Sequence, residues 1–166
     1  SVASLFISRW DVAVAGKVPP ALANRLGIAI GQRSYKAYCD LVATPRYRRV
    51  MNAGGRPQRL LFASTGTKDP KASDVMYVEA LAAPFTVNTI PEGTLLAAGD
   101  HATITGETRA DGGDCESVLA QFKAAGVDVD ALAAQLQDEG AASFVKSWHE
   151  LMGVLAAKSA ALGKAA

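Results

Sequence analysis

The stretch Arg56–Pro70, RPQRLLFASTGTKDP, decides the fold class of this chain. It contains a short apolar run, Leu60 to Ala63, and then a turn-rich loop that starts at Ser64. Short apolar runs bounded by turn signals are typical of strands in a parallel sheet, where both faces are covered. We therefore predict a buried parallel strand over residues 60–63 and a loop over residues 64–70.

Further strands and helices are predicted on either side of this stretch. Val2–Ile7 is an apolar run typical of a buried strand, and Thr86–Thr89 is a short third strand. The spacing of apolar residues predicts helices over residues 21–42, 45–53, 74–82, 115–125, 129–138 and 141–155, and Thr89-Ile90-Pro91-Glu92 predicts a capping box that opens one more. Strands that alternate with helices indicate βαβ units, so the predicted fold class is α/β with a parallel sheet.

The length and the strand number predict part of a (β/α)8 barrel. A complete barrel typically needs about 250 residues, whereas this chain has 166. Three barrel strands with terminal helices match that length, and we expect a single domain over residues 1–166 whose tail, residues 156–166, frays. Because the chain opens directly on an apolar strand, we expect an N-terminal portion to be missing or to lie on another piece.

The charge balance argues against several classes of protein. Lys and Arg number 17 and Asp and Glu 16, which gives a net charge of +1, so no nucleic-acid or membrane partner is predicted from bulk electrostatics. No apolar run approaches the length of about 20 residues that spans a bilayer, and no signal peptide is predicted. Cys39 and Cys115 form no C-x-x-C motif, which favours a cytoplasmic location.

Polar side chains follow each predicted strand. Ser8-Arg9, Ser64-Thr65 and Asn88-Thr89 come at the three strand ends, and Lys68 lies in the loop after the second strand. The carboxyl ends of parallel strands meet at one edge of a sheet, where ligands bind. A guanidinium, an ammonium and several hydroxyls are the donors of a phosphate site. The alternative interpretation is that both cations are surface charges and that the hydroxyls form turns.

Other motifs carry less weight. Gly66-Thr67-Lys68 lacks the spacing of a P-loop, and His149-Glu150 has no second histidine at position 153, so no metal site is predicted. The apolar stripe Trp148–Met152 is interpreted as core packing. The arginines between residues 46 and 59 are interpreted as a solvated helix face.

Four ordered segments resemble bacterial transaldolases. SVASLFISRWD (residues 1–11), RPQRLLFASTGTKDP (56–70) and YVEALAAPFTVNTIPEGTLLAAGDH (77–101) resemble the sixth, seventh and eighth barrel strands of that family, and FVKSWHELM (144–152) resembles its closing helix. The departures are mild: Phe62, Ile90 and Ala102 stand where Trp, Met and Gly are usual.

The resemblance implies a fold and an activity. The fold would be the C-terminal part of a (β/α)8 TIM barrel with additional C-terminal helices. The activity would be that of a transaldolase, a transferase of the pentose phosphate pathway that moves a dihydroxyacetone unit from fructose 6-phosphate to erythrose 4-phosphate. The family uses a Schiff base on a fourth-strand lysine and neither a metal nor an organic cofactor.

The resemblance also implies roles for particular residues. Ser4 matches a serine that faces the substrate hydroxyls, Arg9 the arginine that grips the phosphate, and Ser64 a serine near the same phosphate. Lys68 is taken as a stand-in for an arginine of the same loop, and Thr65 as a helper through its hydroxyl or amide. The Schiff-base lysine is expected upstream, so no catalytic residue is predicted in this chain and the chain alone should form no imine.

Two alternatives remain open at this point. One is a smaller fructose 6-phosphate aldolase of the same superfamily. The other is a non-catalytic module that binds sugar phosphates. In each case the expected partners are sugar phosphates, together with the remainder of the barrel on a missing segment or with further copies of the chain, because an open three-stranded sheet exposes unpaired edges.

Overall fold

The computed structural model describes residues 1–163. The chain forms two compact units, Ser1–Val127 and Asp128–Ala166. The first contains all the strands of the described chain, and the described part of the second contains a single helix. The extent of the single domain expected over residues 1–166 stays a prediction.

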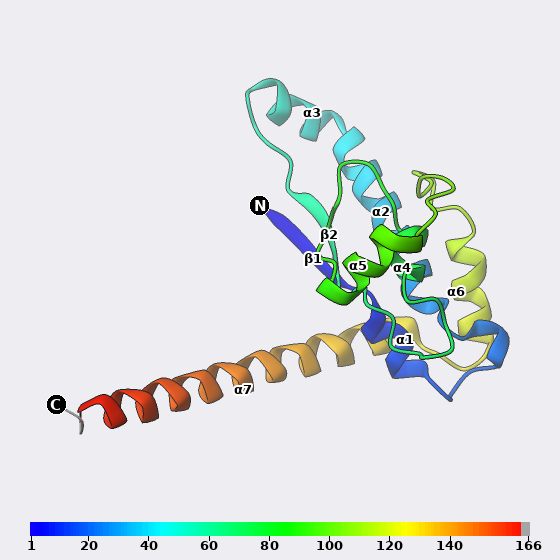
Figure 1. Ribbon diagram of the computed structural model, residues 1–166. Helices are drawn as coiled ribbons and strands as arrows, with labels where there is room; N and C mark the ends of the chain where they lie inside the picture. The colour runs from blue at the N-terminus through cyan, green and yellow to red at the C-terminus, as the bar shows by residue number, and fades with distance from the viewer. Residues whose placement is uncertain (164–166) are drawn as a thin grey trace. The chain divides into compact units, whose positions relative to one another are not determined.

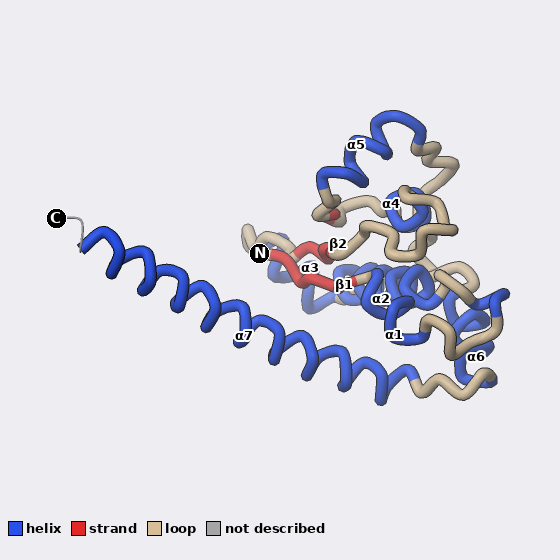
Figure 2. The backbone as a smooth tube through the Cα atoms, turned by 60° about the horizontal axis from the view of Figure 1, so that its bottom comes forward, coloured by secondary structure: helices blue, strands red, loops and turns tan. Residues whose placement is uncertain are grey.

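The first unit is built on a three-stranded parallel sheet, drawn red in Figure 2. Its strands are β1 (Val2–Phe6), β2 (Arg59–Ala63) and β3 (Val87–Asn88), in the order β1-β2-β3. In register, Phe6 pairs with Ala63, and Phe62 with Asn88, so the carboxyl ends of the three strands lie at one edge. The predicted α/β class with a parallel sheet is therefore confirmed.

Helices connect and cover these strands, as Figure 1 shows. They are α1 (Ser8–Val14), the 3₁₀ turn η1 (Pro20–Leu22), α2 (Leu26–Ala43), α3 (Pro45–Asn52), α4 (Met76–Ala80), α5 (Glu92–His101) and α6 (Cys115–Ala124). The core lies between α2 and the sheet, and its buried members are Ile7, Tyr35, Leu60, Phe62, Tyr77 and Leu81. α2 also packs against α1 and α6.

Close packing explains why α2 contains Gly31, a residue type that disfavours helix. A Cβ atom on Gly31 would lie 2.8 Å from a Leu81 methyl group, closer than side-chain carbons pack. The glycine therefore lets α2 approach the core, at a cost in helix propensity of about 1 kcal/mol.

Three local predictions are corrected by the structure. The helix predicted from residue 21 begins only at Leu26, because Asn24 has a φ of 60° that a helix does not accommodate. The capping box at residues 89–92 is wrong: Thr89 donates its N–H to Phe62 as an extension of β3, and the extended Pro91 precedes α5 without a side-chain cap. β1 is present, but Val2 is 41% exposed, because side chains alternate along the strand and Val2 lies on the face opposite that of the core-packed Leu5.

Within the described residues, the second unit contains one helix, α7 (Val129–Gly163). The sequence predicted two helices here, yet the helix continues through Gly140 and over residues 156–163 because the flanking Ala, Leu, Lys and Gln residues favour helix. Fraying of the tail stays a prediction. Residues 164–166 lie outside the described part.

The apolar stripe of α7 does not pack in a core within the described residues. Trp148 is 59% exposed, because a single helix has no second element in its own unit to bury its apolar face. Within residues 1–163, no helix combines the length and the apolar character needed to cross a membrane.

Candidate functional site

The ends of β1 and β2 are joined beyond the strands themselves. Ile7 and Ser8 donate their N–H groups to the carbonyls of Ala63 and Ser64, which continues the parallel ladder. The Oγ atoms of Ser8 and Ser64 lie 2.8 Å apart. Ser64 has a φ of 56°, in the left-handed region that non-glycine residues rarely adopt, and such strain is concentrated at functional sites.

Thr65 connects β2 to β3. Its side chain is fully buried, and its hydroxyl donates to Oδ1 of Asn88 at 2.7 Å. The direction of this hydroxyl is therefore fixed by the neighbouring strand. Ser8 and Asn88 were both predicted at strand ends, but the sequence does not show which residues they contact. Only the pairing of the strands reveals these partners.

Arg9 lies in the first turn of α1, half-buried, with its guanidinium 4.3 Å from the centre of the Phe6 ring. Stacking on an aromatic face restrains the plane of a guanidinium. No carboxylate within residues 1–163 forms an ion pair with Arg9. The arginine is thus oriented and retains its hydrogen-bonding fork.

Ser4 and Phe6 lie on the same face of the sheet. Leu5, between them, packs against the core, and it pairs in register with the buried core residue Phe62. Because side chains alternate along a strand, Ser4 and Phe6 point away from the core that α2 covers. Ser4 is exposed there.

Lys68 is placed differently from the other predicted residues. It is exposed and lines a cavity of about 490 Å³ together with Asp11, Asn24, Asp69 and Tyr77. Arg9, Ser4 and Ser64 are not among the residues that line this cavity. The structure therefore brings Ser8 to Ser64, Thr65 to Asn88 and Arg9 to Phe6, whereas Lys68 lies on the rim of a cavity beside α1.

Hydrogen bonds hold the loop that carries Lys68. Asp69 accepts from the side chain of Asn24 at 2.8 Å and from the N–H of Lys71 at 2.9 Å. These bonds hold the pKa of Asp69 below its ordinary value, with the Asn24 bond the larger cause. Farther along the loop, Nε2 of His101 lies 2.9 Å from Oδ1 of Asp74.

We predict that His101 stabilises the first unit most at low pH. Hydrogen bonds with Asp74, first, and Asp100 raise the pKa of His101 above its ordinary value. A raised folded-state pKa gives stability that is fully present below about pH 6.5 and is lost as pH rises through the folded value. His101→Gln should therefore lower the urea midpoint at about pH 5.5 more than at about pH 9.

The matched control for this prediction is His149→Gln, because His149 is exposed on α7. An equal loss for His101→Gln at both pH values would contradict the prediction.

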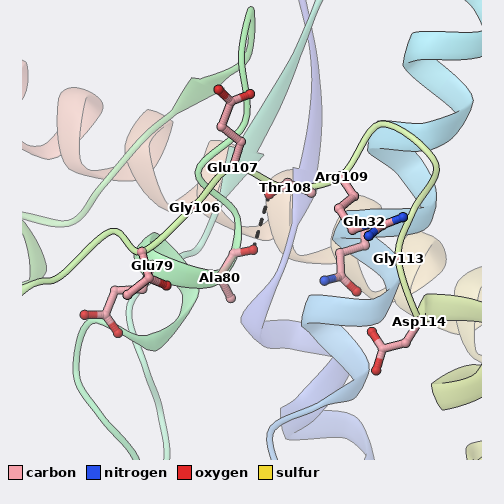
Figure 3. Close-up of a pocket in the computed structure, with 10 residues that line it drawn as sticks. Gln32, Glu79, Ala80, Gly106, Glu107, Thr108, Arg109, Gly113 and Asp114 are labelled. Atoms are coloured by element: carbon pink, nitrogen blue, oxygen red, sulfur yellow. Dashed lines mark hydrogen bonds between the residues drawn. The ribbon is translucent and has the colours of Figure 1, made fainter.

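A second cavity of about 600 Å³, shown in Figure 3, lies between α2, α4 and the loop before α6. Glu79, Glu107 and Asp114 give it negative charge, and Arg109 is paired with Asp111. Thr108 anchors the loop through its bond to the carbonyl of Ala80. None of the predicted site residues lines this cavity, and no group of three metal-ligating side chains occurs within residues 1–163.

The strands contain no lysine over any of their residues, Val2–Phe6, Arg59–Ala63 and Val87–Asn88. The lysines of the described chain lie on helices and loops.

Comparisons with known proteins agree on one family. Residues 1–155 match the family described as transaldolase/fructose-6-phosphate aldolase. The transaldolase of Thermobifida fusca is 41% identical over 169 residues, which covers 97% of this chain and 46% of the relative. The transaldolases of Saccharopolyspora erythraea and Mycolicibacterium smegmatis are 41% and 39% identical, each covering 92% of this chain and 43% of its own length. The chain thus spans less than half the length of these relatives.

Proposed function

This chain belongs to the transaldolase/fructose-6-phosphate aldolase family, and we propose that it supplies the phosphate-binding side of a transaldolase. The observation that carries the proposal is Arg9: a half-buried guanidinium at the carboxyl end of a parallel strand, oriented by Phe6 and without a carboxylate partner in the described chain. A guanidinium that is oriented and has no carboxylate partner is suited to bidentate binding of a phosphate.

We propose that β1, β2 and β3 are the last three strands of a (β/α)8 barrel. Their parallel arrangement in chain order supports this, as does the face that bears Ser4. In such a barrel the face of the sheet opposite the helices lines the interior. Ser4 would then face the substrate hydroxyls from inside the barrel.

The proposed reaction transfers a dihydroxyacetone unit from fructose 6-phosphate to erythrose 4-phosphate. A lysine outside this chain would form the Schiff base, which accepts the electron pair of the breaking C–C bond. Within this chain, Arg9 would hold the phosphate with Ser64 and the backbone N–H of Thr65, and Lys68 would add a point charge from the adjacent loop. Holding the phosphate would fix the position of the reacting carbon relative to that lysine.

No metal or organic cofactor forms part of this proposal. A cytoplasmic location is also proposed, and it is supported by two cysteines, Cys39 and Cys115, that are both free thiols.

Binding measurements test this proposal directly. We expect the chain to bind fructose 6-phosphate, with inorganic phosphate as a competitor, and to bind fructose at least about tenfold more weakly, since the phosphate supplies charge-assisted contacts. Borohydride should trap no adduct on this chain. Equal affinities for the two sugars would overturn the proposal, and an adduct on Lys68 would make Lys68 a nucleophile instead of a phosphate ligand.

The alternative functions predict different products. An aldolase would release free dihydroxyacetone from fructose 6-phosphate without an acceptor, whereas a transaldolase requires erythrose 4-phosphate. A non-catalytic binding module is favoured by one observation, the lack of a lysine in β1, β2 and β3. The reading frame upstream of Ser1 separates this module from the enzyme, because only the enzyme needs a strand with a buried lysine.

A further inference from the structure

Asp11 is a buried carboxylate to which the proposed phosphate site gives no role. It is 6% exposed, and three groups donate to it. Oδ1 accepts the N–H of Leu26 at 2.9 Å, and Oδ2 accepts the N–H of Gly27 at 3.1 Å and the hydroxyl of Tyr77 at 2.7 Å. Tyr77 is itself 1% exposed. One side chain of α1 is therefore bonded to the start of α2 and to α4.

The start of α2 is shaped to receive this carboxylate. A Cβ atom on Gly27 would lie 2.6 Å from Oδ2 of Asp11 and 2.7 Å from the carbonyl oxygen of Ile7. Only glycine permits this approach. The first N–H groups of α2 have no partner within the helix, and the positive end of the helix dipole favours an anion there. Asp11 supplies that anion from 15 residues earlier in the chain.

The protonation states fit these hydrogen bonds. Burial raises the pKa of Asp11 above its ordinary value, and the three donors act in the opposite direction, with Tyr77 the largest of them. Burial, and then the charge of Asp11, raise the pKa of Tyr77 far above its ordinary value. Tyr77 therefore keeps its proton and remains a donor.

The geometry of α1 links Asp11 to the phosphate site. α1 has only seven residues, too few to be stable through its own hydrogen bonds. Asp11 follows Arg9 by two positions, so their side chains leave the helix about 200° apart. Asp11 points to α2 while Arg9 stacks on Phe6. Any rotation of α1 that broke the bonds of Asp11 would also move Arg9.

We propose that Asp11 and Tyr77 are positioning residues that fix α1 so that Arg9 is aimed at the phosphate. The inference rests on the proposed function, because it assumes that Arg9 binds a phosphorylated sugar. Tyr77 lies beyond the loop that carries Lys68, and Asp11, Tyr77 and Lys68 line the same cavity. The bond between Asp11 and Tyr77 thus connects the segment that follows β1, which carries Arg9, to the segment that follows β2, which carries Lys68.

Tyr77→Phe tests the inference with little change in packing. We expect its dissociation constant for fructose 6-phosphate to rise roughly threefold to tenfold, since small misplacements of a binding group are costly. Asp11→Asn should have a larger effect. The carboxylate accepts three hydrogen bonds, and the NH2 group of asparagine would face at least one of those donors instead of accepting from it. The matched control is Tyr47→Phe, since the Tyr47 hydroxyl is buried without a hydrogen-bond partner in the described chain.

A spectroscopic measurement distinguishes positioning from stability alone. Trp10, next to Arg9 in α1, is 8% exposed, and Trp148→Phe removes the other tryptophan of the chain. In that background, well below the unfolding midpoint, Tyr77→Phe should make Trp10 emission more accessible to acrylamide, whereas Tyr47→Phe should not. A residue that contributes only stability would leave both the quenching and the affinity of the folded protein unchanged.

The outcomes separate this inference from the proposed function. If the parent chain fails to bind fructose 6-phosphate, the proposed function is overturned and the inference with it. If the parent binds, and Tyr77→Phe and Asp11→Asn bind equally well while folded, the inference alone is overturned. Weaker binding by the Tyr77→Phe and Asp11→Asn variants together with greater quenching of Trp10 supports it.

Discussion

Replacing Arg9 by alanine is expected to weaken binding of fructose 6-phosphate by about 2–5 kcal/mol, the range for truncating one partner of a desolvated charge pair. This corresponds to roughly 30-fold or more in the dissociation constant. The physical reason is that Arg9 is half-buried, stacked on Phe6 and unpaired by any carboxylate in the described chain, so its fork is free for a ligand. Isothermal titration with fructose 6-phosphate measures the effect.

Two variants sharpen this first prediction. Arg9→Lys keeps the charge but loses the bidentate fork, so it should recover only part of the affinity. Arg56→Ala removes an exposed arginine ahead of β2 and should change little. If Arg9→Ala and Arg56→Ala weakened binding equally, general charge would account for the effect and Arg9 would not be a phosphate ligand.

Replacing Phe62 by alanine should destabilise the first unit by about 3–5 kcal/mol, through lost burial and the cavity left behind. Phe62 is 0% exposed in β2, the middle strand of the sheet, and belongs to the same buried cluster as Ile7, Tyr77 and Leu81. Because small domains are stable by only about 5–15 kcal/mol, a loss of this size approaches the whole stability. Urea unfolding followed by circular dichroism measures it.

The control for this second prediction is Phe85→Ala, since Phe85 is 82% exposed and its replacement should change stability by at most about 0.5 kcal/mol. If Phe62→Ala proves unfolded without denaturant, Phe62→Leu provides a smaller, measurable loss. Equal stabilities for Phe62→Ala and Phe85→Ala would contradict the assignment of Phe62 to the core.

Much of the fold was predictable because its signals are local. Leu60 to Ala63 forms β2 as predicted, since a short apolar run with a turn after it has few other stable arrangements. The parallel sheet followed from the alternation of strands with helices. The polar residues at the strand ends, Ser8 and Arg9 among them, also followed from the sequence, because the position of a residue after a strand does not depend on distant contacts.

Elements held by distant contacts were missed or misplaced. α1 was not predicted, because a helix this short is fixed by Asp11 and by Ser8 bonding to Ser64. The capping box failed because pairing of the chain near Thr89 with β2 draws that residue into the sheet. The second unit was predicted as two helices because Gly140 and its neighbours signal a break that the surrounding helix formers override.

The sequence by itself determined the fold class, the family resemblance and the residues that follow each strand, since these depend on local composition and order. Tertiary structure alone decided which of those residues meet. It joined Ser8 to Ser64, Thr65 to Asn88 and Arg9 to Phe6, and placed Lys68 beside a separate cavity. The bond between Asp11 and Tyr77 joins residues 66 positions apart. Such a bond forms only when the core brings α1, α2 and α4 together, so no local pattern encodes it.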